Sequence, residues 1–221
     1  MTNHHEVTPA LVLDWDGTVT ERDTLAMTIE RFGDENVYEV TDGALEHGGM
    51  TLADVIAAEI GTVEAPLDEV LEYLVEHVRV RRGFRELVEA YDPLIVSAGF
   101  HELIDPILAR EGIQARVVAN HVAAAPGGWR PSFRESPPCE VCGEPCKRGA
   151  LSELGPFVYV GDGFSDRCVS LAAARRFARG GLARWLDGQG VAYERFDDLH
   201  DVLDALVEGR SEEGAGDGRG G

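Results

Sequence analysis

Four short apolar segments, each ending in small or polar residues, constrain the fold of this chain more than any other feature. They are residues 10–13, 93–96, 115–119 and 157–160, and most of them are followed by a helical pattern. Buried strands that alternate with helices are typical of a parallel sheet with crossover helices. Ligands of such sheets bind beyond the carboxyl ends of the strands. We therefore expect an α/β fold of three layers, with a parallel sheet between helices.

The stretch between the first two strands is too long for a single crossover. Apolar residues repeat at helical spacing over 67–78, behind a proline that suits a first helical turn, and a shorter amphipathic segment precedes them. We expect residues 20–83 to form a helical insert that lies as a lid over the strand ends, although packing of its helices on the sheet stays open. The core then comprises 1–19 and 84–210. Residues 211–221 are rich in Gly and Glu, so we expect a disordered tail there.

The charge balance limits the partners and the setting of the chain. Forty acidic residues against 20 basic ones give a net charge of -20, which repels nucleic acid and anionic membranes. No apolar run is long enough to span a membrane, and the polar residues 1–9 contain no apolar leader, so a cytoplasmic location is expected. Molar salt shortens the Debye length to about 3 Å and screens the repulsion. A halophilic protein is predicted, with an ordinary acidic surface as the alternative.

Four aspartates lie at the ends of two predicted strands. Asp14 and Asp16 flank one residue after the first strand, and Asp162 follows the strand at 157–160, with Asp166 one helical turn further along. Carboxylates held this close repel one another unless a cation lies between them. Mg²⁺ meets that need because it prefers oxygen ligands and keeps waters and a phosphate in its shell. The sequence therefore predicts a magnesium site.

Ser97 and Lys147 are candidates for binding an anion. Ser97 ends the second predicted strand, where its hydroxyl and nearby backbone amides can donate hydrogen bonds. Lys147 is the only lysine, whereas the other 19 basic residues are Arg. A compact ammonium is thus favoured at this position over a planar guanidinium.

In order and spacing, these residues resemble the four motifs of the haloacid dehalogenase superfamily. The matching segments are Asp14-Trp15-Asp16-Gly17-Thr18, Ser97, Lys147 and Gly161-Asp162-Gly163-Phe164-Ser165-Asp166. The resemblance covers residues 11–169, and the helical insert is similar to the cap of the phosphoserine-phosphatase-like branch. It implies a Rossmann-like core with a small α-helical cap after the first strand. The implied reaction is Mg²⁺-dependent hydrolysis of a phosphomonoester through an aspartyl-phosphate.

The resemblance also implies a role for each motif residue. Asp14 would attack phosphorus, while Asp16 would act first as general acid and then as general base. Asp166 would orient the waters of the metal. Mg²⁺ would be held by three groups, namely Asp14, Asp162 and the backbone carbonyl of Asp16. The phosphoryl oxygens would be held by Thr18, Ser97 and Lys147.

The expected partner is a small phosphorylated metabolite bound by a monomer or homodimer, and the identity of the metabolite stays open. Phosphoserine is an alternative, because Asp23 could bind its amino group. However, no Arg or Lys lies between Phe32 and Val78 to bind its carboxylate, so a neutral leaving group is favoured. A partial resemblance to a methionine-salvage phosphatase of the same branch rests on three segments: 120–121, 139–147 and 177–179. A non-catalytic metal-binding or interaction protein on the same scaffold is the second alternative.

Three cysteines have the spacing of a zinc knuckle that lacks one ligand. They are Cys139, Cys142 and Cys146, in a loop rich in Pro and Gly. His121, across a predicted hairpin, is the candidate fourth ligand of a Zn²⁺ ion, and three reduced thiols that shape the loop are the equal alternative. Cys168 lies in an apolar helical segment, so we expect it to be a buried small hydrophobic side chain. Disulfides are not expected.

Overall fold

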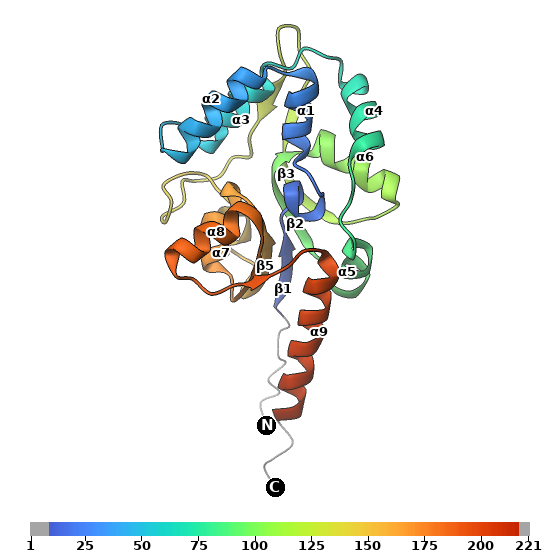
Figure 1. Ribbon diagram of the computed structural model, residues 1–221, viewed down its shortest axis with the longest axis vertical. Coiled ribbons are helices and arrows are strands. Elements are labelled where there is room, and N and C mark those ends of the chain that lie inside the picture. The colour runs from blue at the N-terminus through green and yellow to red at the C-terminus, as the bar shows by residue number, and fades with distance from the viewer. Residues whose placement is uncertain (1–8, 217–221) are drawn as a thin grey trace.

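The computed structural model describes residues 9–216 (Figure 1). Most of the polar segment 1–9, on which the cytoplasmic expectation partly rests, and the end of the predicted tail, 217–221, lie outside the described residues. Residues 211–216 belong to the last helix, which differs from the disorder expected for them. None of the helices within the described range combines the length and the apolar character that crossing a bilayer requires.

A seven-stranded sheet forms the centre of the described part of the chain, in the order β4-β3-β2-β1-β5-β6-β7. All neighbouring strands are parallel except β4, which runs antiparallel to β3. The strands are β1 (Ala10–Leu13), β2 (Leu94–Phe100), β3 (Arg116–Ala123), β4 (Arg130–Ser132), β5 (Phe157–Gly161), β6 (Arg175–Ala178) and β7 (Glu194–Arg195). The predicted α/β fold with a parallel sheet is confirmed.

Helices cover both faces of the sheet (Figure 1). Side chains alternate along each strand, so Leu11 and Leu13 pack on one face while Val12 packs on the other. The first face carries α5 (Phe84–Tyr91), α6 (His101–Glu111) and α9 (Leu199–Gly216). The second face carries the 3₁₀ helix η2 (Lys147–Leu151), α7 (Arg167–Ala172) and α8 (Gly180–Gln189). The result is the predicted three-layer arrangement.

The first four of the five α-helices between β1 and β2 form the helical insert at the carboxyl ends of the strands (Figure 1). They are α1 (Thr24–Phe32), α2 (Glu35–Glu46), α3 (Leu52–Ile60) and α4 (Leu67–His77). α2 packs against α3, and α4 packs against both α1 and α6. The chain enters and leaves the insert side by side, because Thr20 and Val80 form an antiparallel bridge. The guanidinium of Arg81 stabilises this junction between core and insert by donating hydrogen bonds to the backbone carbonyls of Gly17, Thr18 and Thr20.

Candidate active site

The parallel pairing of β1 with β5 brings the first and last aspartate motifs together. Leu13 lies opposite Val160, and the Asp14 amide donates to the Val160 carbonyl at 2.9 Å, so the chain leaves both strands at one level of the sheet. After Asp14 the backbone forms an irregular turn, η1 (Trp15–Val19). Gly17 in this turn has a φ of 77°, and a Cβ there would lie 2.3 Å from Oδ2 of Asp162. Only glycine allows the turn and the carboxylate to approach this closely.

Three carboxylates meet at this point. One oxygen each of Asp14, Asp162 and Asp166 lies within 4.8 Å of the other two. Burial raises the pKa of Asp14 to about 8, with a further contribution from Asp166, and burial together with Asp14 raises the pKa of Asp162 to about 8. Carboxyls that resist ionisation in this way would be stabilised as carboxylates by a divalent cation. The donor set therefore fits Mg²⁺.

Asp166 differs from the other two because donors surround it. Its Oδ2 accepts hydrogen bonds at 2.9 Å from the amides of Asp162 and Gly163, and its Oδ1 accepts from Lys147 at 2.7 Å and from the Tyr159 hydroxyl at 2.6 Å. Burial opposes its ionisation, but Lys147 and the Gly163 amide outweigh burial and lower the pKa of Asp166. These bonds occupy the acceptor sites of a carboxylate. Asp166 is thus a fixed anion that orients its neighbours and has little capacity left to bind a metal directly.

Lys147 lies between two of the aspartates at the start of η2. Its Nζ forms ion pairs with Asp14 and with Asp166, and only 3% of the residue is exposed. Burial disfavours the charged amine, but the two carboxylates outweigh burial and raise the pKa of Lys147. Lys147 therefore stays charged and holds positive charge against Asp14.

Asp16 is fixed by the first helix of the insert. Its Oδ1 accepts hydrogen bonds from the Thr24 amide at 2.8 Å and the Thr24 hydroxyl at 2.5 Å, and Asp23 caps the same helix through the Ala26 amide. Burial and the neighbouring Asp23 raise the pKa of Asp16 to about 7. A carboxyl group with a pKa near neutrality can both release and take up a proton, which is what acid and base catalysis needs.

The two hydroxyls predicted to hold phosphoryl oxygens are both fully buried and have different contacts. Ser97, in β2, accepts a hydrogen bond from the Gly99 amide at 2.8 Å and lies 3.4 Å from Oδ2 of Asp16, so it borders the reaction site. Thr18 instead donates to Oδ1 of Asp162 at 3.0 Å. A hydroxyl has a single proton to donate. In this structure Thr18 therefore contributes to the position of Asp162.

A cavity of about 180 Å³ opens between these residues and the insert. Asp14, Asp16 and Asp162 line its floor. Its upper wall comes from α1, α2 and α3 with their flanking residues, and includes Asp23, Leu25, Ala26, Tyr38, Leu45, Leu52, Val55, Ile56 and Glu59. Among the described residues that line it, none is Lys or Arg.

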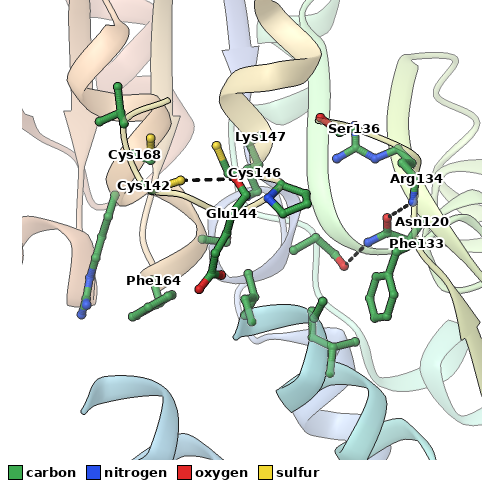
Figure 2. A pocket seen from close by; sticks show the side chains of 18 of the residues that line it. Asn120, Phe133, Arg134, Ser136, Cys142, Glu144, Cys146, Lys147, Phe164 and Cys168 are labelled. Carbon is green, nitrogen blue, oxygen red and sulfur yellow. Dashed lines mark hydrogen bonds between the residues drawn. The ribbon is translucent and has the colours of Figure 1, made fainter. Parts of the chain in front are cut away.

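A second cavity of about 450 Å³ adjoins the first and shares Leu52 and Ile56 with it. Figure 2 shows Lys147 and the cysteine loop on one side of this cavity, and Asn120, Phe133 and Arg134 on the other. Asn120 joins two segments of the wall, because it donates to the Ala98 carbonyl at 2.7 Å and accepts from the Arg134 amide at 3.1 Å. Most of the exposed lining is apolar.

Sequence reasoning missed Arg134 as a residue of this site. Its buried Nε has no hydrogen-bond partner among the residues that the structure describes. The sequence carried only a weak signal for Arg134. Its position depends on the antiparallel strand β4 and on the hydrogen bond from its backbone amide to the side-chain oxygen of Asn120, and neither feature has a recognisable motif. Arg134 is one of three basic residues among the described residues that line the larger cavity, together with Lys147 and Arg167.

The structure corrects two of the expectations for the cysteines. Cys139, Cys142 and Cys146 do cluster, but the fourth group beside them is the thiol of Cys168, and His121 is not part of the cluster. His121 contacts Oε1 of Glu102 at 2.8 Å through its Nδ1 atom. Cys168 is partly exposed, so its assignment as a buried hydrophobic side chain was also wrong. The reason is tertiary: α7, which carries Cys168, packs against η2, which directly follows Cys146.

Comparison with known proteins agrees with this arrangement. A family model described as haloacid dehalogenase-like hydrolase matches residues 11–170. The bifunctional enzyme MtnB/MtnX of Bacillus licheniformis is 27% identical over 90% of this chain, which spans about half the length of that relative, 49%. The 2-hydroxy-3-keto-5-methylthiopentenyl-1-phosphate phosphatase of Bacillus thuringiensis subsp. konkukian is 23% identical over 87% of this chain and 93% of its own length.

Solved structures of the same fold include two phosphoserine phosphatase structures. The phosphoserine phosphatase from T. onnurineus has a TM-score of 0.65 at 20% identity, with 93% of this chain and 97% of that chain covered. A substrate-bound phosphoserine phosphatase complex has a TM-score of 0.66 at 20% identity, with 90% and 99% covered. At this level of identity the likeness shows a shared fold.

Proposed function

The chain belongs to the haloacid dehalogenase-like hydrolase family, and we propose that it is a Mg²⁺-dependent phosphatase that hydrolyses a small phosphorylated metabolite through an aspartyl-phosphate. One observation carries the proposal. A buried Asp14 lies at the end of β1 between Lys147 and the Asp162 carboxylate, with the carboxyl of Asp16 two residues away. These residues would supply a nucleophile, a cation, a metal ligand and a proton donor at one small cavity.

In the proposed reaction, Asp14 attacks phosphorus and forms a P–O bond while the bond to the leaving alkoxide breaks. Asp16 donates its proton to that oxygen, and then takes a proton from the water that attacks the aspartyl-phosphate and regenerates Asp14. Asp14, Asp162 and the Asp16 carbonyl would hold Mg²⁺, which supplies neutralisation of the nucleophile and the phosphate. Asp166 acts as a positioning residue through its bonds to Lys147 and to the Asp162 amide.

Lys147 and Ser97 are the residues proposed to hold the phosphoryl oxygens. Lys147 already borders Asp14, so its ammonium can stabilise charge that develops on the transferred group. Ser97 lies beside Asp16, where an incoming phosphate would meet its hydroxyl. Thr18, by contrast, is proposed to keep Asp162 in place through its hydrogen bond.

We propose that residues 20–83 act as the cap of this site, over a core of 1–19 and 84–210. The cavity at Asp14 and Asp16 takes its upper wall from this insert. Its acidic lining, Asp23 and Glu59, together with apolar side chains, disfavours a leaving group with a second negative charge. A neutral polyol or keto-enol leaving group fits better, and the apolar cavity next to it suits a substrate with an apolar tail, such as the substrate that names the Bacillus thuringiensis phosphatase.

The setting that we propose is a cytoplasm of high salt. The support is the acidic excess of the sequence, 40 acidic against 20 basic residues, because such a surface loses much of its self-repulsion when salt is concentrated.

To test the proposed reaction, the protein is first freed of metal with a chelator. It is then assayed at molar KCl against a panel of phosphomonoesters, with and without added Mg²⁺. We expect turnover that depends on Mg²⁺, and loss of at least about 1,000-fold of it in Asp14→Asn, because an amide cannot attack phosphorus. Circular dichroism checks that the variant is folded. Turnover of Asp14→Asn within tenfold of the parent would remove Asp14 as the nucleophile, and an inert parent would favour a non-catalytic binding protein.

A further inference from the structure

We propose that Cys139, Cys142, Cys146 and Cys168 bind one structural Zn²⁺ ion, which fastens the loop before Lys147 to helix α7. This site is separate from the carboxylate cluster of Asp14, and it does not depend on the proposed reaction.

The spacing of the four sulfur atoms fits one tetrahedral ion. All four lie within 4.8 Å of one another, and Sγ of Cys139 is 3.7 Å from Sγ of Cys168. Zinc–thiolate bonds of about 2.3 Å place sulfurs about 3.8 Å apart along the edge of a tetrahedron. A disulfide would need about 2.05 Å, and all four cysteines are free thiols. The sulfurs are therefore arranged as ligands around a common centre.

The backbone around Cys139 has the form of a metal-binding turn. The Gly143 amide donates to the Cys139 carbonyl at 2.8 Å, and Gly143 has a φ of 79°, which reverses the chain after Cys142. The Val141 amide points at Sγ of Cys139 at 3.5 Å. A backbone amide that donates to sulfur stabilises the thiolate form, which is the form that binds metal.

The other two ligands come from rigid elements on the same side of the sheet. Cys146 is the residue that precedes η2, and Cys168 is the second residue of α7. These two elements pack against each other, so the positions of both thiols are set by the core as well as by the loop. Two ligands from a turn and two from packed helices make a site that folding brings together.

The chemistry of the donor set favours zinc in a structural role. Four thiolates are soft ligands, and a tetrahedral arrangement of four sulfurs selects zinc or iron. All four coordination positions are taken by protein, so no position is left for water or substrate. The ion would therefore hold the fold in place without taking part in the chemistry at Asp14.

The proposed zinc site lies in the wall of the larger cavity, so the ion would also stabilise that wall. Cys142, Glu144 and Cys146 line the 450 Å³ cavity beside Lys147 (Figure 2). Lys147 directly follows Cys146, and α7, which carries Cys168, directly follows Asp166. One ion bound by both Cys146 and Cys168 would therefore link the two segments that carry the Lys147–Asp166 ion pair. Loss of the ion would loosen one wall of the cavity.

The test measures metal directly in the full-length chain, purified with a thiol-free reductant and no added metal. Elemental analysis is expected to find about one zinc per chain, and Co²⁺ in its place is expected to give the visible bands of a tetrahedral thiolate site. Cys168→Ser should lose the zinc and melt at a lower temperature. His121→Ala is the matched control, because it removes the candidate ligand that lies outside the cluster, and it should keep the zinc. Asp14→Asn should also keep it.

Several results would overturn the proposal. They are a parent that takes up neither Zn²⁺ nor Co²⁺, iron in place of zinc, zinc retained by Cys168→Ser, or zinc lost from His121→Ala. If Cys168→Ser does not fold, Cys142→Ser on the exposed turn replaces it, with the same expected loss. Competition between the parent and a coloured chelator for Zn²⁺ gives a further measure that needs no variant. Since none of these measurements uses turnover, failure of the zinc site and failure of the phosphatase proposal are distinguishable.

Discussion

Gly17→Ala tests whether the position of Asp162 sets the activity of the proposed site. A Cβ on Gly17 would lie 2.3 Å from Oδ2 of Asp162, whereas ordinary contact begins at 3.4 Å, so the carboxylate must retreat by about 1.1 Å. That movement would break the 3.0 Å hydrogen bond from Thr18, which we value at about 1 kcal/mol. The φ of 77° adds about 1–2 kcal/mol of backbone strain for a residue with a Cβ.

We expect the free energy of unfolding of Gly17→Ala to fall by about 2–3 kcal/mol. The larger effect falls on activity, because a displacement of about 1 Å in a catalytic group costs about 100-fold in rate. A chromogenic phosphate ester gives kcat/KM, a Mg²⁺ titration gives the metal affinity, and denaturant unfolding gives the stability. The apparent affinity for Mg²⁺ is expected to fall with kcat/KM.

Gly112→Ala is the matched control. Gly112 ends α6 with a φ of 63°, but a Cβ there would meet nothing within 4 Å. The control therefore carries the same backbone strain without the clash, and it should lose about 1–2 kcal/mol of stability with its activity unchanged. If kcat/KM of Gly17→Ala stayed within threefold of that of Gly112→Ala, the argument that Gly17 sets the position of Asp162 would be refuted.

Three further predictions follow from the charges. The melting temperature should rise from low salt to about 2 M KCl, because screening removes more repulsion than attraction; a steady fall in calorimetry would contradict the halophilic interpretation. Lys147→Arg keeps the charge but overfills the buried space between Asp14 and Asp166, so kcat should fall about 100-fold and stability by about 1–3 kcal/mol, and wild-type kinetics would contradict this. In a competition assay, kcat/KM for phosphoserine should lie at least about tenfold, or about 1.4 kcal/mol, below that for a neutral polyol phosphate; a preference for phosphoserine would indicate that Arg134 reaches the substrate.

The fold could be predicted because its determinants are local. An apolar run such as 10–13 that ends in a polar turn predicts a strand by itself, and the repeat over 67–78 predicts α4 by itself. The relation of the strands also follows, because alternating strands and helices leave few arrangements other than a parallel sheet. Helices α1 to α4 lie within the range 20–83 that was expected to form the insert, while their contacts with the cavity residues came from packing.

Site residues could be identified from the sequence where a reactive side chain stands at the end of a predicted strand or the start of a predicted helix. Asp14, Asp162 and Lys147 were chosen as residues at strand ends or at a helix start, and the parallel pairing of β1 with β5 brings them together. Thr18 was chosen because it stands in a motif, and in the structure its hydroxyl donates to Asp162, 144 residues away. Residue type and order could not give that contact.

Four of the seven strands, the motif residues, the acidic excess and the three closely spaced cysteines could thus be identified from the sequence alone. Folding in three dimensions was needed to show that Cys168, and not His121, joins those cysteines, and that Arg134 lines the larger cavity. The reason is physical. Strand and helix preferences arise within a few residues along the chain, whereas the partners of a side chain are set by packing between α7 and η2 or between β3 and β4, and no local pattern encodes those contacts.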